Sequence, residues 1–117
     1  MKGQTIILLD DDAELRNYLA AVLEGDGYQV VCAANSQDLT KLVLQHQAAL
    51  LITDLVMPEH EGMEGIFQVL QQHRIPIIAM SSYAQYLEVV ESVVSRTLLK
   101  PLQAEQLLQE VYDVLEG

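Results

Sequence analysis

Predominantly apolar runs alternate with amphipathic segments along this chain. Residues 5–9 form the first run, which is typical of a strand buried on both faces of a sheet. Apolar residues then recur at intervals of three and four, as on one face of a helix, at Leu15, Tyr18, Leu19, Val22 and Leu23. Asp12 is placed to cap the start of this helix, and Gly25 and Gly27 end it. The chain therefore begins with a strand and a helix.

The same alternation continues to the C-terminal end. Apolar runs at 28–33, 50–54, 76–80 and 97–99 predict further strands. The helical segments carry Leu39, Leu42 and Val43; Ile66, Phe67, Val69 and Leu70; Leu87, Val90 and Val94; and Leu107, Leu108, Val111, Tyr112 and Leu115. Ser36 is placed to cap the first of these helices. Because parallel neighbouring strands need crossover connections, the order predicts an α/β fold: a single, doubly wound (βα)5 domain with helices on both faces of a parallel sheet.

Composition agrees with a single domain and limits its partners. The chain has 117 residues, half of them hydrophobic, which is enough for a core without disulfide or metal support. Residues 1–117 are therefore expected to form one domain, with no attached output domain. The net charge is −11, with only 6 Lys and Arg. This charge would repel a phosphate backbone, so direct nucleic-acid binding is not expected.

The sequence predicts a cytoplasmic protein without a membrane span. No segment approaches the roughly 18 consecutive apolar residues of a spanning helix, and the N-terminus is too short and polar to begin a secretion signal. The single cysteine, Cys32, has no partner for a disulfide, which favours a reducing compartment. Its position inside an apolar run predicts a buried, small hydrophobic side chain.

Four of the predicted strands end in, or run directly into, a charged or hydroxyl-bearing residue. Asp10 and Asp11 follow the first strand, Asp54 ends the third, Ser81 follows the fourth and Lys100 the fifth. Each has an ordinary explanation alone, such as a helix cap, a turn or a solvated lysine. In a doubly wound sheet, however, ligands collect beyond the carboxyl ends of the strands. The five residues together therefore predict one site.

The residue types at this edge favour phosphoryl chemistry. Three neighbouring carboxylates repel one another unless a cation is present. Mg²⁺ takes one or two carboxylates and leaves coordination positions for water and phosphate oxygens. A lysine ammonium holds a phosphate as a point charge, and a serine hydroxyl donates to its oxygens. Asp54 is the candidate nucleophile, forming an acyl phosphate.

The chain resembles a response-regulator receiver domain of the CheY-like superfamily of two-component signalling. The resemblance runs along the whole length and is carried by Asp10-Asp11, Asp54, Met57-Pro58, Gly62, Ser81 and Lys100-Pro101. It implies a flavodoxin-like sheet of order 2-1-3-4-5 and a phosphorelay function. The phosphoryl donor would be a histidine kinase or a histidine phosphotransfer protein.

The resemblance also implies a role for each site residue. Asp11 and Asp54 would bind Mg²⁺, or Mn²⁺ in its place, together with the Val56 carbonyl, and Asp10 would act through water. Ser81 and Lys100 would contact the phosphoryl group, with a cis Lys100-Pro101 bond. The domain would catalyse its own phosphorylation and slow dephosphorylation without being a turnover enzyme. Its output is either a docking partner or a domain outside this sequence.

The chain departs from the common receiver pattern near its fourth helix. Thr97 stands where many relatives have Tyr or Phe, and the interval from Ser81 to Lys100 is short, which predicts a short or distorted fourth helix. Val56 and Tyr83 flank the site where polar groups would help to position water. A slowly hydrolysing phospho-Asp54, lasting on the order of tens of minutes, is therefore expected.

Two alternatives remain from other classes. Asp10, Asp11 and Asp12 contain the acid-any-acid spacing of haloacid-dehalogenase-type phosphatases, in which the first acid is the nucleophile. Those enzymes need more chain than is present here. A pseudo-receiver adaptor would keep the fold and never accept phosphate.

Overall fold

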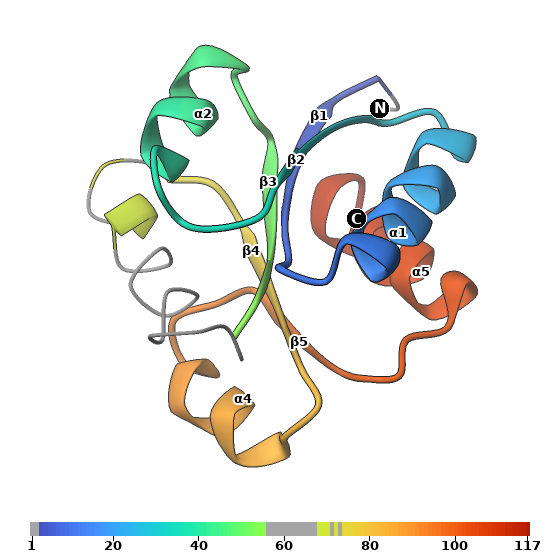
Figure 1. Cartoon of the computed structure of the whole chain (residues 1–117), viewed down its shortest axis with the longest axis vertical. Helices are drawn as coiled ribbons and strands as arrows, with labels where there is room; N and C mark the ends of the chain where they lie inside the picture. Colours follow the sequence, from blue (N-terminus) through green and yellow to red (C-terminus); the bar gives the residue numbers. More distant parts are fainter. Residues whose placement is uncertain (1–2, 56–67, 71, 73) are drawn as a thin grey trace.

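The computed structural model describes residues 3–55, 68–70, 72 and 74–117. The described strands and helices (Figure 1) follow one another in the order β1 (Thr5–Leu9), α1 (Ala13–Gly25), β2 (Gln29–Ala33), α2 (Leu39–Gln45), β3 (Leu50–Asp54), β4 (Ile77–Ser81), α4 (Ala84–Val90), β5 (Arg96–Leu99) and α5 (Ala104–Leu115). Ile66 and Phe67, predicted for a third helix, lie outside the described residues; Val69 is buried.

The strands form one five-stranded sheet of order β2-β1-β3-β4-β5. Each of its neighbouring pairs is parallel. The predicted fold and strand order are therefore confirmed. None of the described helices combines the length and the hydrophobicity that a membrane-spanning segment needs.

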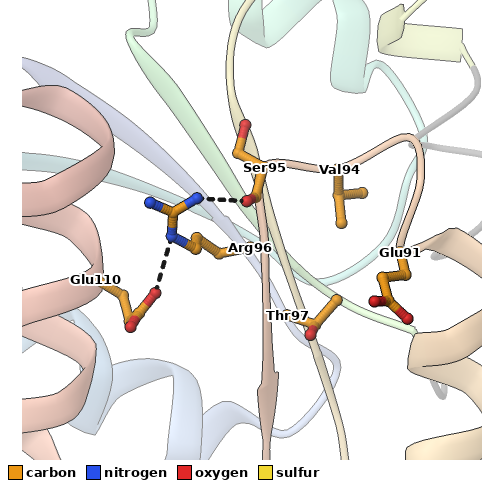
Figure 2. A pocket seen from close by; sticks show the side chains of 6 residues that line it. All are labelled: Glu91, Val94, Ser95, Arg96, Thr97 and Glu110. Carbon is orange, nitrogen blue, oxygen red and sulfur yellow. Dashed lines mark hydrogen bonds and ion pairs between the residues drawn. The ribbon is translucent and has the colours of Figure 1, made fainter.

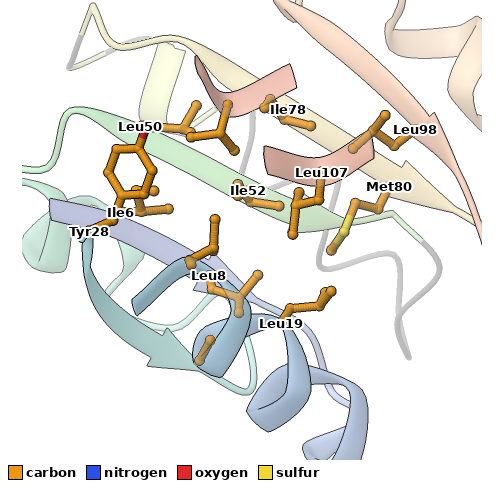
Figure 3. Close-up of a cluster of buried hydrophobic side chains, with 13 residues drawn as sticks. Ile6, Leu8, Leu19, Tyr28, Leu50, Ile52, Ile78, Met80, Leu98 and Leu107 are labelled. Atoms are coloured by element: carbon orange, nitrogen blue, oxygen red, sulfur yellow. The ribbon is translucent and has the colours of Figure 1, made fainter. Parts of the chain in front are cut away.

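Helices cover both faces of the sheet, and this explains why its central strands are apolar throughout. Ile6 and Leu8 of β1 pack with α1 and α5 on one face, in the cluster of Figure 3. Ile7 and Leu9 pack on the opposite face, with α2 and α4. All four side chains are fully buried. A strand with no solvent-facing side has no position for a polar residue until it ends.

The register brings the carboxyl ends of the central strands to the same edge. Leu9 of β1 is aligned with Thr53 of β3, and Asp54 with Met80 of β4. Ser81 of β4 is aligned with Leu99 of β5. Residues that directly follow these strands therefore meet at one edge of the sheet.

Helix α4 is short, as predicted. It contains seven residues, with Leu87 and Val90 buried. Val94, expected on the same helix, lies beyond its end but still packs against the apolar cluster. The chain turns into β5 too soon after Val90 for a longer helix to form.

The prediction that the Cys32 side chain is buried was wrong. Cys32 is exposed, because β2 is an edge strand and its residues are at most partly buried. Tyr18 and Tyr112, which lie on the apolar helix faces that the spacing predicts, are at the edge of the core and about half exposed, at 51% and 50%. In α1 the buried face is formed by Leu19, Ala20 and Leu23. The small Ala20 takes a core position, so Tyr18 lies at the rim of that face.

The predicted cap of α2 was also wrong. The helix begins after Asp38, which has the left-handed conformation (φ 62°) and makes no side-chain hydrogen bond to the helix. Ser36 instead accepts a hydrogen bond through its backbone carbonyl from the Leu39 N–H (3.1 Å). A turn of two residues therefore separates Ser36 from the helix that it was expected to cap.

Candidate functional site

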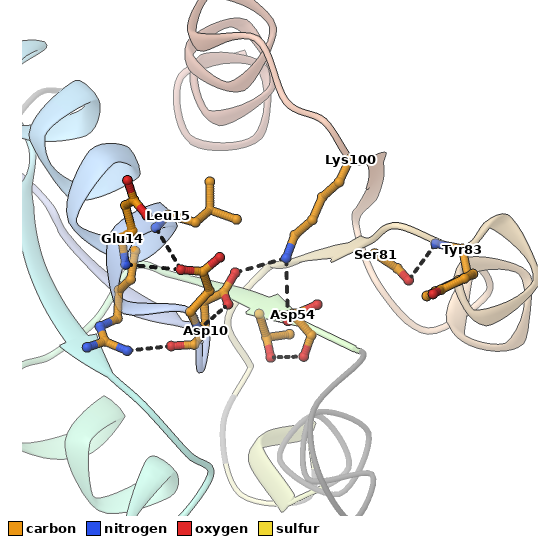
Figure 4. Close-up of polar contacts among 10 residues, drawn as sticks. Asp10, Glu14, Leu15, Asp54, Ser81, Tyr83 and Lys100 are labelled. Carbon is orange, nitrogen blue, oxygen red and sulfur yellow. Dashed lines mark hydrogen bonds and ion pairs between the residues drawn. The ribbon is translucent and has the colours of Figure 1, made fainter.

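The polar residues predicted to form a site do meet at the carboxyl edge of the sheet. Asp10 directly follows β1, Asp54 ends β3, Ser81 ends β4 and Lys100 directly follows β5. Figure 4 shows Asp10, Asp54 and Lys100 directed toward one another from three different strands. The three belong to distant parts of the sequence and are brought together by the parallel register.

Three carboxylates share a small volume. Asp10, Asp11 and Asp54 each offer an oxygen within 4.8 Å of the others. Asp10 is fully buried and Asp54 is 3% exposed, whereas Asp11 is exposed. Negative charges at this separation, two of them withdrawn from water, require compensation by a cation or by protonation.

Lys100 supplies part of that compensation. Its Nζ lies 3.0 Å from Asp10 Oδ2 and 3.4 Å from Asp54 Oδ2, and its side chain is 15% exposed. One ammonium against three carboxylates leaves the cluster negative. The donors present are carboxylate oxygens, which are the ligands that Mg²⁺ prefers, and the exposed position of Asp11 leaves one side open to water and phosphate. The residues therefore fit a magnesium site.

The turn after β1 holds Asp10 in place. The Asp12 N–H donates to Asp10 Oδ1 (2.9 Å), and the Asp10 N–H donates to the carbonyl of Ala33 (3.1 Å). Asp12 in turn caps α1, as predicted, accepting from the N–H groups of Glu14 (3.0 Å) and Leu15 (3.2 Å). The buried charge is thus supported by hydrogen bonds as well as by Lys100.

Ser81 is fully buried beside this cluster. Its Oγ accepts a hydrogen bond from the Tyr83 N–H (3.0 Å), and its carbonyl accepts from the Lys100 N–H (2.7 Å). The hydroxyl hydrogen of Ser81 is not used in either bond and is available for an oxygen of a bound anion. The Tyr83 ring is half exposed and meets Tyr86 edge-on, with centroids 5.7 Å apart.

Part of the predicted site lies outside the described residues, namely Val56 together with Met57, Pro58 and Gly62. The cis Lys100-Pro101 bond is confirmed. Arg16 was missed by the sequence reasoning: its Nη1 donates to the backbone carbonyl of Asp10 (2.6 Å). The available signal was a basic residue on the helix that directly follows the acid pair.

Two hollows flank β5 at its opposite ends. The first, of about 470 Å³, adjoins the carboxylate cluster and is lined by Asp12, Leu15, Ser82, Lys100, Pro101 and Leu102. The second, of about 390 Å³, is shown in Figure 2 and is lined by Glu91, Val94, Ser95, Arg96, Thr97 and Glu110. Arg96 Nε lies 3.3 Å from Glu110 Oε2 there. Only the first of these two hollows includes a site residue.

Comparison with known proteins relates this geometry to one family. The family model described as "Response regulator receiver domain" matches residues 6–112. Response regulator RR06 of Streptococcus pneumoniae is 32% identical over 77 residues, which cover 66% of this chain and 36% of that protein. An uncharacterised 14.6 kDa protein of Leptolyngbya boryana is 34% identical over 83 residues, covering 68% of this chain and 63% of that one. The match thus spans less than two thirds of either relative.

Solved structures with the same fold include several receiver domains. The signal receiver domain of a response regulator from Bermanella marisrubri is 25% identical, with a TM-score of 0.88 over 98% of this chain and all of that chain. TrrA of Thermotoga maritima, in complex with Mg²⁺ and BeF, is 24% identical, with a TM-score of 0.86 over 96% of this chain and 99% of that chain. CheY4 of Vibrio cholerae is 23% identical, with a TM-score of 0.84 over 97% of this chain and 99% of that chain.

The family match covers most of the chain, and the fold and the strand order agree with it. The chain therefore belongs to the response regulator receiver domain family.

Proposed function

We propose that residues 1–117 form one receiver domain that takes a phosphoryl group from a phosphohistidine onto Asp54, in a magnesium-dependent reaction. The observation that carries this proposal is the contact of Lys100 Nζ with both Asp10 and Asp54, at 3.0 and 3.4 Å, inside a cluster of three carboxylates. A phosphoryl group placed at this cluster would therefore be within reach of the Asp54 nucleophile, of the carboxylate metal ligands and of the Lys100 ammonium.

In this mechanism an Asp54 carboxylate oxygen attacks the phosphorus atom. The new P–O bond forms as the P–N bond to the donor imidazole breaks, and the imidazole nitrogen keeps the electron pair and takes up a proton. Asp10, Asp11 and Asp54 would hold Mg²⁺, and the bound ion would neutralise charge on the phosphoryl oxygens. Lys100 contributes a second positive charge at those oxygens, which stabilises the transition state.

The added charge then acts on the loop after β4. The Ser81 hydroxyl, whose Oγ accepts from the Tyr83 N–H at 3.0 Å, donates its hydrogen to an oxygen of phospho-Asp54. This bond draws the β4–α4 connection toward the site and favours one of two conformations of the adjoining surface. The donor is a histidine kinase or a histidine phosphotransfer protein, and the output is carried by a protein or domain that recognises the shifted surface.

The magnesium requirement has support from a relative. TrrA, which shares the fold, is in complex with Mg²⁺ and BeF. The carboxylate oxygens of Asp10, Asp11 and Asp54 fit the same kind of ion here. Val56, whose carbonyl belongs to the proposed ligand set, lies outside the described residues.

The test is phosphorylation by acetyl phosphate, with Asp54→Asn as the matched variant. Intact mass spectrometry should show one added phosphoryl group on the wild-type chain with Mg²⁺ present, and none with EDTA or in Asp54→Asn. A haloacid-dehalogenase-type phosphatase would still be labelled at Asp10 in Asp54→Asn. A pseudo-receiver would give no label in the wild-type chain. Either result would overturn the proposal.

The same sample measures the lifetime of the acyl phosphate. Val56 stands two residues after Asp54 in the sequence and Tyr83 two residues after Ser81, and neither is a short polar residue that would help to position water. Hydrolysis is therefore expected to take on the order of tens of minutes. Loss of the added mass after removal of acetyl phosphate gives the half-life. A half-life of seconds would contradict this part of the proposal and leave the phosphoacceptor assignment intact.

A further inference from the structure

Arg16 makes a short contact with the site from outside the carboxylate cluster. It lies on α1, and its Nη1 donates to the backbone carbonyl of Asp10 at 2.6 Å in partly buried surroundings. This carbonyl belongs to the peptide that joins Asp10 to Asp11. A peptide unit is planar, so fixing its oxygen also fixes the direction in which the chain enters Asp11.

The orientation of the Asp11 side chain depends on the backbone more than the orientations of Asp10 and Asp54 do. Asp10 and Asp54 are buried and contact Lys100, whereas Asp11 is exposed. Packing therefore does little to aim the Asp11 carboxylate. The backbone on either side of the residue is held by two hydrogen bonds, one from Arg16 to the Asp10 carbonyl and one from the Asp12 N–H to Asp10 Oδ1 (2.9 Å).

We propose that Arg16 is a positioning residue for Asp11, and that it raises the magnesium affinity of the site by holding the Asp10–Asp11 peptide. The inference rests on the proposed function, in which Asp11 is a metal ligand. Arg16 touches neither the metal nor the phosphoryl group in this assignment. Its effect passes through the backbone, as for groups that orient metal ligands elsewhere.

An electrostatic role and a positioning role of Arg16 predict opposite changes in Mg²⁺ affinity, so a measurement of that affinity distinguishes them. A cation near the cluster repels Mg²⁺, so a purely electrostatic role would make the site bind Mg²⁺ more tightly when Arg16 is neutralised. A positioning role predicts weaker binding in the same variant. The guanidinium already donates to a carbonyl and is partly exposed to solvent, which screens its repulsion. In a neutral Arg16 variant, the effect of a misplaced Asp11 on Mg²⁺ affinity is therefore expected to exceed the effect of the removed charge.

The decisive variant is Arg16→Met, which keeps an apolar stem of similar length and removes both the donor and the charge. Titration with Mg²⁺ alone, followed by backbone amide NMR, should give a dissociation constant about 10-fold higher than in the wild type. Arg16→Lys keeps a charged donor and should recover most of the affinity. Exchange of the Asp12 amide hydrogen, measured without metal, should be faster in Arg16→Met than in the wild type.

Arg96→Ala is the matched control, because Arg96 is exposed and is paired with Glu110 at the other end of β5. This variant should leave Mg²⁺ binding unchanged. If Arg16→Met binds Mg²⁺ as tightly as the wild type or more tightly, the inference is overturned and the proposed function stands. If wild-type protein itself binds no Mg²⁺, the proposed function and this inference both fail.

Discussion

Several contacts of the candidate site converge on Asp10. It is fully buried, and its oxygens accept from Asp12, Arg16 and Lys100. A buried carboxylate is tolerated only when it is paired and hydrogen-bonded. The sequence placed Asp10 and Lys100 at the same edge of the sheet, but it contained no evidence that the ammonium would lie between two carboxylates.

Ser81 carries the first prediction at this scale. Ser81→Ala removes the acceptor of the Tyr83 N–H and should lower the free energy of unfolding by about 1 kcal/mol. It should also slow phosphorylation by acetyl phosphate, because the hydroxyl donor is lost. Ser81→Thr keeps the hydroxyl and should retain most of the rate. Ser82→Ala is the control, since Ser82 is exposed; equal effects of the Ser81→Ala and Ser82→Ala changes would contradict the assignment.

Cys32 carries a prediction about pH. Although Cys32 is exposed as a residue, its thiol is partly desolvated, and this raises the thiol pKa; the charge of Arg16 lowers that pKa and the charge of Glu24 raises it. Since the thiolate is the nucleophile, iodoacetamide should alkylate the native chain more slowly than the unfolded chain at pH 8. The alkylation midpoint, measured against pH, should rise further in Arg16→Met. A native midpoint at or below the unfolded one would refute this.

The raised pKa of the Cys32 thiol also makes the stability of the fold depend on pH in a defined direction. The native thiol holds its proton to higher pH than the unfolded thiol, so this group stabilises the fold fully below the unfolded pKa. That contribution is lost as the pH rises through the native pKa. Cys32→Ser should therefore weaken the decline of stability in this alkaline range.

At the scale of elements, position in the sheet decided what each strand buries. β1, β3 and β4 are central and almost entirely buried, whereas β2 and β5 are edge strands with exposed residues. The apolar runs predicted all of these strands, but their hydrophobicity did not separate edge from centre. This is why Cys32 was expected in the core and lies at the surface.

Helix α4 offers a matched pair of neighbouring valines. Val90 is fully buried and Val89 is 63% exposed. Val90→Ala should lower the free energy of unfolding by about 2 kcal/mol, from lost burial and the cavity left behind. Val89→Ala should change it by less than about 0.5 kcal/mol. Guanidinium denaturation measures both, and similar losses would show that α4 does not pack as described.

At the scale of the whole molecule, acidic charge and metal binding are linked. The chain has a net charge of −11, and three of its carboxylates lie within 4.8 Å of one another. A cation that binds only the native cluster stabilises the fold by mass action. The metal-free domain is therefore expected to be less stable than the magnesium-bound one.

Magnesium at about ten times its dissociation constant should add about 1.4 kcal/mol to the free energy of unfolding, or about 5 °C in melting temperature. Asp11→Asn should raise the melting temperature of the metal-free protein, because one repelling charge is removed, and should lose most of the response to Mg²⁺. Differential scanning fluorimetry measures both effects. NaCl at matched ionic strength is the control, and an equal shift with NaCl would argue against a specific site.

The hydrophobic periodicity of the sequence, with the polar residues, glycines and prolines that interrupt it, was sufficient to predict the order of the strands and the fold class. It also predicted the strand ends at which Asp10, Asp54, Ser81 and Lys100 lie. This was possible because a strand covered on both faces must be apolar until it ends, so the first polar residue after each run marks the functional edge. The predicted sheet order is confirmed as well.

Only the tertiary structure decided which of these groups touch. In the structure Lys100 contacts both Asp10 and Asp54, Arg16 donates to the Asp10 carbonyl, and Cys32 lies at the surface and not in the core. These outcomes depend on register, on helix rotation and on which strand lies at an edge. A local sequence pattern does not predict these contacts and exposures, because each is set by residues that are distant along the chain.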